Sequence, residues 1–543
     1  MGSNDATLED FVDFERLKGR RGNFEAHWTE VAERFLPEQS FDFYSNFPAE
    51  RTRGEKRMSQ IYDATGMVAL DRFGAILDSL LTPSNQRWHL LKASDDNLNQ
   101  LRDVQIWFAE VNKILFKSRY APGANFVSQN QQNYQSLGAY GTGCLFIDEL
   151  DGGRGLRYKN VHLSQIYFKE NHQGLVDTAY RYFPMTVRQA YQKWGDKLPD
   201  KYKKRLEKNP EEEFFFLHAV KPNTDIDPDR IDAKGMKFTS RYSCEEGKDL
   251  LDEGGYQTFP YPISRYYQAT GEVYGRSPAM RVLPAAKVLN EIKKTLMKQG
   301  HRALDPVLLA HDDGVLDSFS MKPGSINFGG VDRSGRPLVR ALPTGSPIAG
   351  KDQAKEEREL INDVFLVTLF QILVDTPTMT ATEVVERTRE KGILLAPTVG
   401  RQNSEYLGPT IQRELDVLSG QAGVLPPMPP ALLEAEGDYE IQYDSPMSRM
   451  QRAEELSGAM QSINHATDLV GITGNASHLD HFDLDAIVPE AALIRGMPAK
   501  WINDPGTIKK IRAGRAQQAQ AQQAIQAAPG AAALMNATTK ATE

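Results

Sequence analysis

The sequence is poor in cysteine, in long apolar runs and in excess positive charge. Its two cysteines, Cys144 and Cys244, have no metal-type partners near them. A disulfide framework is therefore excluded, and a reducing compartment is expected. No run of about eighteen apolar residues could span a bilayer, and the N-terminal MGSNDATLEDF lacks the apolar stretch of a secretory signal. These absences predict a soluble protein without a membrane anchor.

The charge balance limits which partners the chain can hold. The net charge is -8 and the sequence pI is ≈ 5.8, so there is no general excess of positive charge to hold a phosphate backbone. Contact with nucleic acid must therefore be local or weak. The sequence also has no G-x-x-x-x-G-K-[ST], H-E-x-x-H or G-x-S-x-G motif, so none of these signatures marks a catalytic site.

What is present indicates a mixed α/β body. Apolar residues at helical spacing predict helices over Gly54 to Leu81 and Leu101 to Ser118. From about Gly143 to Tyr267, short β-like runs alternate with Gly, Asn and Asp turns. These runs are CLFIDEL, LRYKNV, QIYFKE, TAYRYF and EFFFLHAV, and one helical insertion, TVRQAYQKWG, interrupts them. The pattern predicts a mostly antiparallel sheet.

A long helix with a basic face should follow this body. Ser277 and Pro278 suit a helix start, and the helix should run to about Arg302. Five basic residues lie on its exposed face: Lys287, Lys293, Lys294, Lys298 and Arg302. For an isolated helix, a solvated face would be the favoured interpretation of these charges. It is less favoured here, because the same helix leads into an insertion that is expected to require oligomerisation.

The segment Asp305 to Pro347 is rich in Gly and Pro and has three short β-like runs, around Val307, Ile326 and Leu338. So few strands are not stable alone. We therefore expect them to pair with another sheet, most economically one from a second copy of the chain.

A second helix should run from about Gln353 to Leu373. It begins acidic, with Glu356, Glu357, Glu359 and Asp363, so two helices of opposite surface charge flank the β insertion. This arrangement suggests that the basic helix of one subunit packs against the acidic helix of a neighbouring subunit.

A short loop, Val374 to Met379, then leads to Thr380-x-x-Glu383, a capping box that begins the next helix. Punctuation at Gly392 and Pro397 predicts a kink or break in that helix before its end near Ser419.

The C-terminal part should be helical. A Pro-rich linker, VLPPMPPALL, precedes a heptad-like seam from Ala453 to Val470, and two further helices follow. The Ala/Gln-rich tail predicts disorder, or helix only when several copies bundle.

Two short motifs have competing interpretations. GAYGTG, Gly138 to Gly143, has the spacing of a phosphate loop but enters a strand, which favours a turn or bulge. HLDHFDLD, His478 to Asp485, has two His and three Asp, yet it directly precedes a helix that Asp483 or Asp485 would cap. Capping is the favoured interpretation, and no metal site is expected.

The order of these parts, more than any single motif, indicates a family. A mixed α/β body, a basic helix, a β insertion, an acidic helix, a short loop, a kinked helix and a helical C-terminal block follow one another. This order resembles the portal proteins, the head-to-tail connectors of short-tailed, T7-like bacteriophages. The resemblance runs from about Leu8 to Gln523. It is closest in GEVYGRSPAMRVLPAAKVLNEIKK, TATEVVERTREKG and DLDAIVPEAALIRGMPAKWINDPGTIKKIRAGRAQQAQAQQ.

The resemblance implies a helix-rich α+β portal fold that assembles into a ring, usually of twelve subunits. The implied parts are the wing 1–281, first stem helix 282–304, clip 305–351, second stem helix 352–373, tunnel loop 374–380, kinked wing helix 381–424, Pro-rich linker with a short strand 425–444, helical crown 445–520 and tail 521–543.

The resemblance also implies a function. The ring would occupy one capsid vertex, and double-stranded DNA would enter during packaging and leave on infection through its channel. Implied partners are the terminase large subunit, tail adaptor and tail tube proteins, the major capsid and scaffolding proteins, and internal core or ejection proteins at the crown. The protein would assemble in the host cytoplasm and lie in the virion, with no catalytic residue and no cofactor.

The loop between the stem and the kinked helix is the candidate for the innermost part of the channel. Its residues are Val374, Asp375, Thr376, Pro377, Thr378 and Met379. Asp375 is repelled by phosphate, the threonines are small and polar, and Pro377 limits how far the loop can fold back. An acidic channel lets DNA slide, whereas a uniformly basic one would hold it. An ordinary interhelical turn is the alternative.

A different class of function stays open on the sequence alone. A DNA-processing enzyme or a small-oligomer scaffold acting on nucleic acid would share the charge and size of this chain. Such a protein would be a monomer or dimer, whereas a portal forms rings with a central hole.

Overall fold

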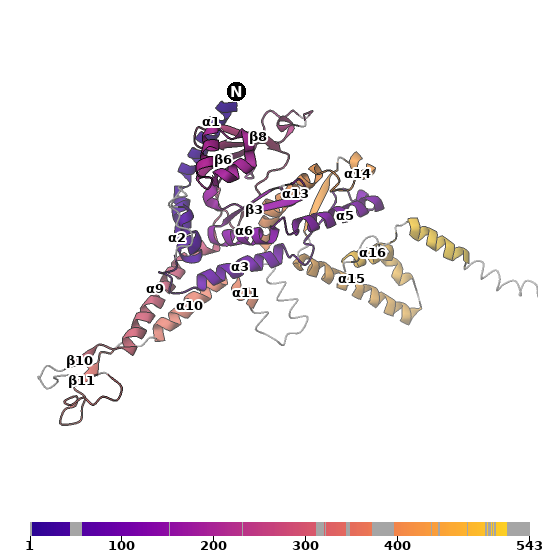
Figure 1. The fold of residues 1–543 in the computed structure, drawn as a ribbon. Helices are drawn as coiled ribbons and strands as arrows, with labels where there is room; N and C mark the ends of the chain where they lie inside the picture. Colours follow the sequence, from indigo (N-terminus) through magenta and orange to yellow (C-terminus); the bar gives the residue numbers. More distant parts are fainter. Residues whose placement is uncertain are drawn as a thin grey trace, which may run out of the picture. The chain divides into compact units, whose positions relative to one another are not determined.

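The structure is a computed structural model in which two compact units are described. The first comprises residues 1–86 and 118–422, and the second comprises 87–117 and 423–543. Within them the described residues are 3–43, 57–150, 152–227, 229–230, 232–310, 320, 322–343, 348–371, 396–435, 437–443, 446–474, 476–494, 497, 501, 503 and 506–518 (Figure 1).

The first unit combines helices with antiparallel sheets, which confirms the predicted mixed α/β class. Its helices are α1 (Ser3–Arg20), α2 (Gly22–Phe35), α3 (Thr65–Leu81), α6 (Phe126–Tyr140), α7 (Val187–Trp194), α8 (Asp200–Lys208), α9 (Pro278–Leu304), α10 (Ile348–Val364), α11 (Val367–Gln371) and α13 (Gly408–Gly420), with short 3-10 turns at Pro37–Phe43, Leu163–Gln165, Gly195–Lys197 and Ala233–Gly235. Its strands are β2 (Thr142–Glu149), β3 (Leu156–Asn160), β4 (Ile166–Glu170), β5 (Val176–Thr186), β6 (Glu213–Pro222), β7 (Phe238–Cys244), β8 (Leu250–Tyr256), β9 (Ile263–Arg265), β10 (Leu308–Ala310) and β11 (Val339–Ala341).

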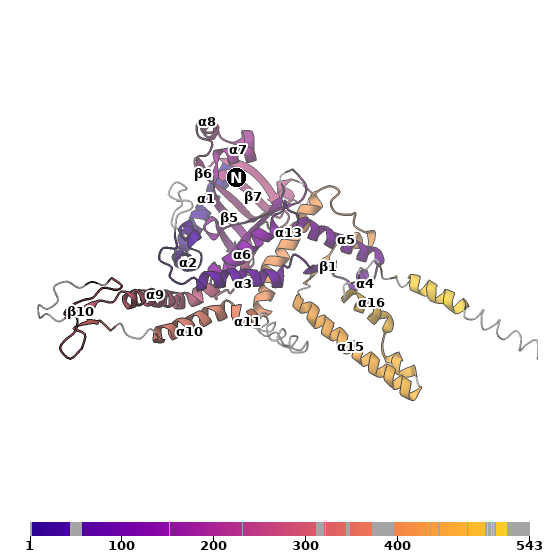
Figure 2. The ribbon, with the colours of Figure 1, turned by 60° about the horizontal axis from the view of Figure 1, so that its bottom comes forward.

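The larger sheet is a five-stranded antiparallel meander in the order β4-β5-β6-β7-β8 (Figure 2). Because side chains alternate across a strand, its two faces have separate cores. Phe11 and Phe14 of α1 pack with Tyr180 and Tyr182 of β5 on one face. On the other face, α7 and α8 cover the sheet, and their buried Val187, Ala190, Trp194 and Tyr202 pack with Phe183, Phe216 and Tyr242.

The smaller sheet, in the order β3-β2-β9, lies next to α6. Gly138 of α6 lets α3 approach closely, because a Cβ there would lie 2.6 Å from Leu70 Cδ1 and 2.7 Å from Phe73 Cδ1. Gly141 ends α6 with φ +77, a conformation that favours glycine. The motif GAYGTG is therefore a helix end that enters β2, as its turn interpretation predicted.

A buried ion pair joins three elements of this unit. Arg119 Nε donates to Glu414 Oε1 at 2.8 Å, and the Tyr158 hydroxyl donates to the same oxygen at 2.7 Å. All three side chains are fully buried. Burial opposes the charge on Arg119, but the Glu414 carboxylate outweighs it and raises the pKa of Arg119. The pair fixes α13 against the end of helix α5 and strand β3.

The helix that ends at Gly420 contains a π turn, Asn403–Leu407, immediately before α13. Gly408 N–H bonds to Asn403 O, five residues back. Pro409 has no N–H to continue the regular ladder, which accounts for an irregular turn at this point. The predicted irregularity exists, but within the described residues it lies at 403–407; Pro397 lies inside a helical stretch, and Gly392 lies outside those residues.

Two predicted helix boundaries are wrong. The first helix begins at Thr65 rather than Gly54, because Asp63 accepts the Thr65 N–H at 3.0 Å and the residues from Arg57 to Ala64 are not helical. The helix expected from about Gln353 to Leu373 begins at Ile348 and is interrupted at Leu366, where φ is +63. The interruption lets both Phe365 and Val367 enter the core.

The second unit contains β1 (His89–Ala93), α4 (Asp96–Asn99), most of α5 (Arg102–Arg119), α14 (Pro430–Glu434), β12 (Tyr439–Tyr443), α15 (Pro446–Thr473), a 3-10 turn (Ala476–His481), α16 (Leu484–Ile494) and helical residues 506–518. β1 and β12 pair antiparallel. Asp483 Oδ1 accepts the backbone N–H groups of Asp485 and Ala486, each at 3.1 Å, so the capping interpretation of HLDHFDLD is confirmed.

Neither unit offers a membrane-spanning helix within the described ranges, because none there is both long and apolar enough. The same ranges contain no group of His, Cys, Asp and Glu arranged to hold a metal ion. Cys144 and Cys244 are both buried free thiols.

We expect Glu414→Gln to destabilise the first unit. The substitution keeps the shape but removes the carboxylate charge that faces Arg119 in the buried ion pair, which costs about 3–5 kcal/mol of unfolding free energy. Thermal or denaturant unfolding measures the loss. Glu211→Gln, which removes the exposed partner of Arg188, is the control and should unfold like the wild type. Equal losses of unfolding free energy in the two variants would show that the buried pair stabilises the unit no more than an exposed pair does.

Candidate functional site

The candidate site is the pair of long helices α9 and α10 with the hairpin that joins them. In both views α10 lies alongside α9, and strands β10 and β11 lie beyond their common end (Figures 1 and 2). The local sequence explains where α9 begins. Ser277 Oγ accepts the Met280 N–H at 2.9 Å, and Pro278 occupies the first helical position. The predicted start of this helix is confirmed.

Only the first half of α9 is packed into the α/β body. Its buried residues lie between Pro278 and Asn290, and from Glu291 to Leu304 no side chain is buried. On α10 the buried residues are Ala354 and Ile361. The last residues of α10 reach the core again, where Phe365 packs against Phe35 and Phe73 with ring centroids 5.7 and 5.9 Å apart. The far halves of both helices therefore project from the body.

Polar contacts hold the near halves in place. Arg358 of α10 donates to Asp63 Oδ2, with its Nη2 at 2.6 Å. Burial raises the pKa of the Asp63 carboxyl, but hydrogen bonds from Thr65 and Arg358 outweigh it and leave that pKa below its usual value. Asn290 of α9 accepts the Tyr62 N–H at 2.7 Å and donates to Gln60 O at 3.0 Å. The segment before α3 therefore fixes both helices.

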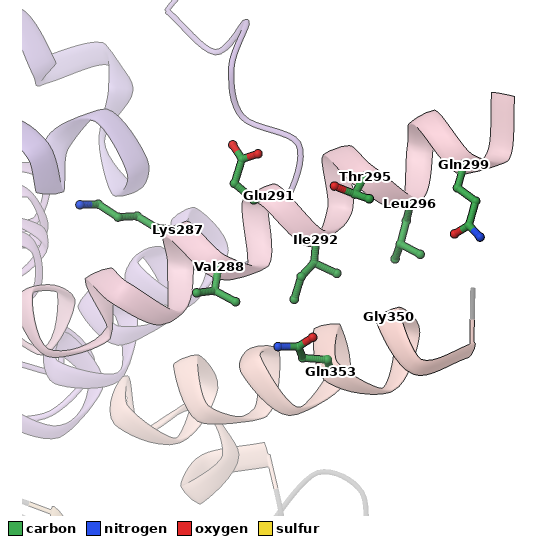
Figure 3. A pocket seen from close by; sticks show the side chains of 9 residues that line it. All are labelled: Lys287, Val288, Glu291, Ile292, Thr295, Leu296, Gln299, Gly350 and Gln353. Atoms are coloured by element: carbon green, nitrogen blue, oxygen red, sulfur yellow. The ribbon is translucent and has the colours of Figure 1, made fainter. Parts of the chain in front are cut away.

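Between the projecting halves lies an open groove of ≈ 570 Å³. Figure 3 shows Ile292 and Leu296 pointing from α9 toward α10, where Gly350 and Gln353 face them. Gly350 permits a close approach, because a Cβ there would lie 3.2 Å from Leu296 Cδ2. Val288, which also lines the groove, is 41% exposed. Apolar surface therefore remains open between the two helices in a single chain.

The predicted basic face of α9 is only partly neutralised within the chain. Lys287 forms an ion pair with Glu30, and Lys294 lies 3.5 Å from Glu291. Lys293, Lys298 and Arg302 form no ion pair among the described residues.

The acidic face of α10 is also largely open. Glu359 pairs with Lys355 at 3.7 Å on the same helix. Glu356, Glu357 and Asp363 have no ion-pair partner in the part of the chain that the structure describes. No ion pair joins the five basic residues of α9 to these four acidic residues within the described ranges.

The hairpin forms differently from the three predicted runs. β10 and β11 pair with each other in an antiparallel register, Leu308 opposite Ala341. The run around Ile326 is not a strand. It belongs to a turn in which Ser320 and Asn327 exchange hydrogen bonds of 2.8 and 2.9 Å. A two-stranded hairpin is marginal alone, so the expectation of an additional partner stays a prediction.

Large apolar side chains are exposed on this hairpin. Phe328 is 87% and Ile326 80% exposed, at the turn that Asn327 closes. In the same segment, residues 322–343 carry four basic side chains, Lys322, Arg333, Arg336 and Arg340, and one acidic side chain, Asp332. The described part of the hairpin therefore combines exposed apolar groups with an excess of positive charge.

The predicted channel loop, Val374 to Met379, and the capping box at Thr380 and Glu383 lie outside the described residues. Sequence patterns gave no signal for the contacts of Asp63, Asn290 and Arg358, because each joins segments more than 200 residues apart. Asn290 alone gives a signal in the sequence, because a polar side chain within the apolar face of a helix often has a specific hydrogen-bond partner.

Comparison with known proteins places these elements in a family. Residues 12–502 match the sequence model described as "Bacteriophage head to tail connecting protein". The chain is 28% identical over 540 residues to the "Portal protein" of Salmonella phage epsilon15, covering 96% of this chain and 93% of that protein. It is also 28% identical over 518 residues to the "Probable portal protein" of Bordetella phage BPP-1, covering 94% and 91%.

These matches confirm the resemblance to phage portal proteins that the order of elements had indicated. Because the match extends over nearly the whole length, this chain belongs to the bacteriophage head-to-tail connecting proteins.

Proposed function

We propose that this chain is the subunit of a dodecameric portal ring at one vertex of a phage capsid, through which double-stranded DNA is packaged and ejected. The observation that supports this most is the projecting half of the α9–α10 pair. No side chain from Glu291 to Leu304 is buried in a single chain, although this half of α9 carries both apolar and charged groups. Neighbouring copies packed around an axis would cover these groups.

Charge supports the same arrangement. The basic residues of α9 and the acidic residues of α10 do not pair with each other within the described chain, but neighbouring copies in a ring would bring one set against the other. The net charge of -8 favours sliding of DNA over retention.

In this proposal, each part of the chain has its own position in the ring and its own partners. The α/β body to residue 281 and the kinked helix 381–424 form the wing, 282–304 and 352–373 the stem, 305–351 the clip, and 445–520 the crown beyond the linker 425–444. The clip docks the terminase large subunit and later the tail adaptor and tail tube. The wing contacts capsid and scaffolding proteins, and the crown contacts internal core or ejection proteins. Exposed Ile472 and Val488 on the crown helices suit such contacts.

Negative-stain images of the purified full-length protein test the ring directly, and Glu356→Lys/Glu357→Lys/Glu359→Lys tests the contact. We expect wild-type rings with a central hole, and a shift of the triple variant toward monomers. A single exposed pair contributes only about 0–1 kcal/mol, but every subunit contact repeats it. The charges are screened by salt, so the shift should shrink as salt increases.

The matched control, Asp196→Lys/Asp200→Lys/Glu207→Lys, changes the same charge near α8 and should leave the rings intact. Wild-type monomers or dimers would contradict the ring and favour the DNA-processing or scaffold alternative. Unchanged rings of the triple variant at low and high salt would contradict the charged contact alone.

The exposed point of the hairpin gives a second prediction. Ile326→Ser/Phe328→Ser should form normal rings and enter capsids but yield few DNA-filled, tailed particles, because the clip loses the apolar groups that a docked partner would cover. Electron microscopy counts the particles. Val68→Ser/Val127→Ser removes apolar groups that are 45% and 44% exposed elsewhere and is the control. Wild-type yields from the hairpin variant would exclude these two residues from docking.

The loop Val374–Met379 gives a third prediction. Replacing Asp375 to Met379 with two glycines should preserve ring assembly and capsid incorporation, because the proposed role is contact with DNA in the channel. Retention of packaged DNA should fall, as measured by genome length per particle. Particles of the variant that hold full-length genomes as well as the wild type would show that the loop only connects two helices.

A further inference from the structure

Three cations from the five-stranded sheet, the smaller sheet and α7 lie near one another, away from the paired helices. Arg181 lies on β5, Lys159 on β3 and Lys193 on α7. Arg181 acts electrostatically on both lysines, and the two lysines act on each other, so the three charges share one region. Like charges this close repel, and the repulsion is stronger where protein replaces water.

Aromatic rings form the floor between these cations. Arg181 Cζ lies 4.5 Å from the Phe183 ring and 5.8 Å from the Phe146 ring, and Phe146 is the cross-strand partner of Lys159. Lys193 Nζ lies 3.8 Å from the centre of the Tyr242 ring. The three positive groups therefore border one continuous aromatic surface.

His218 completes the floor without adding charge. Its ring stacks on Tyr242 with centroids 3.8 Å apart, and it is the cross-strand partner of Arg181. Its ring nitrogens hydrogen-bond to the Tyr261 hydroxyl at 2.6 Å and Ser240 Oγ at 2.9 Å. Burial, then Lys193 and Arg181, keep the pKa of His218 well below its usual value, so the ring is neutral.

The carboxylates nearest these cations form ion pairs with other basic residues. Arg181 is 5% exposed, and within the described residues no carboxylate lies at ion-pair distance from it. Its Nε has no hydrogen-bond partner there. The two carboxylates that act on Lys193 have other cations: Asp148 lies 3.7 Å from Arg413, and Asp252 lies 2.5 Å from Lys197.

Unmatched charge lowers the proton affinity of the lysines. Partial burial of the ammonium groups, together with the charge of Arg181, lowers the pKa of Lys159 and of Lys193 to about 8, although Asp148 acts in the opposite sense on Lys193. Both lysines are exposed residues, so a ligand from solvent can reach them. A buried cation without a counter-charge is costly, and a bound anion would offset that cost.

We propose that Lys159, Arg181 and Lys193, which come from the two sheets and α7, form a binding site for a phosphate-type oxyanion. Three neighbouring cations suit a polyvalent anion better than a single carboxylate, and a guanidinium with two ammonium groups is a common set of phosphate ligands. The oxyanion is either free phosphate or a phosphodiester of nucleic acid. The site does not depend on ring formation or on passage of DNA through a channel.

The test compares the full-length wild type with Lys159→Gln/Lys193→Gln in thermal unfolding. The buffers contain chloride, inorganic phosphate or short duplex DNA at matched ionic strength. In chloride the variant should unfold at a higher temperature than the wild type, because repulsion around Arg181 is relieved. Phosphate should raise the unfolding temperature of the wild type and have little effect on the variant, with phosphate affinity weakened about tenfold or more.

The control is Lys204→Gln/Lys208→Gln, which removes the same charge from exposed positions of the nearby α8 and should respond to phosphate like the wild type. Stabilisation by phosphate alone indicates the free ion, and stabilisation by both ligands that is lost in the site variant indicates a phosphodiester. The proposal is wrong if neither ligand stabilises the wild type more than chloride does, or if the site variant responds like the wild type.

Discussion

The structure depends on one constraint: two long helices leave an α/β body that can bury only their near halves. The body holds α9 through apolar residues between Pro278 and Asn290, and it holds α10 at Ile361 and Phe365. Beyond these points each helix has only the other helix to pack against. Two neighbouring helices cannot cover the full circumference of either one, so apolar surface at Met297 and Leu304 stays open. Packing of neighbouring copies, as in the proposed ring, would cover this surface.

Such a projection requires a stiff attachment, and this chain supplies it with polar contacts at the base. Arg358 and Asn290 hold α10 and α9 to the same short segment before α3, so the two helices keep one orientation relative to the body. Within the same unit, the buried Arg119–Glu414 pair fixes α13, a helix that follows α10 and α11 in the chain. Directional polar bonds specify one geometry where apolar packing alone would tolerate several.

The sequence predicted what local rules determine. Ser277 and Pro278 mark the start of α9, the alternating runs mark the antiparallel sheet, and Asp483 marks the start of α16, because capping and periodicity act within a few residues. It could not predict the break at Leu366, since that residue adopts φ +63 only because Phe365 and Val367 both enter a core built from distant segments. The pairing of β10 with β11 and the Asn290 contacts likewise depend on residues far apart in the chain.

Positive charge is distributed unevenly in this acidic chain, and the proposed roles of α9 and of the region around Arg181 make different demands on it. In a DNA channel, cations that face the DNA have to be few or paired with carboxylates, because free ones would hold phosphate. On α9 only Lys287 and Lys294 are paired within the described chain, and in the proposed ring Lys293, Lys298 and Arg302 would meet the acidic residues of a neighbouring α10. A site that retains an anion needs the opposite, as proposed around Arg181, where no carboxylate of the described residues lies at ion-pair distance from the buried guanidinium. The same side-chain chemistry would therefore have opposite consequences on α9 and around Arg181. The deciding variable is whether an acidic partner lies within about 4 Å of the cation.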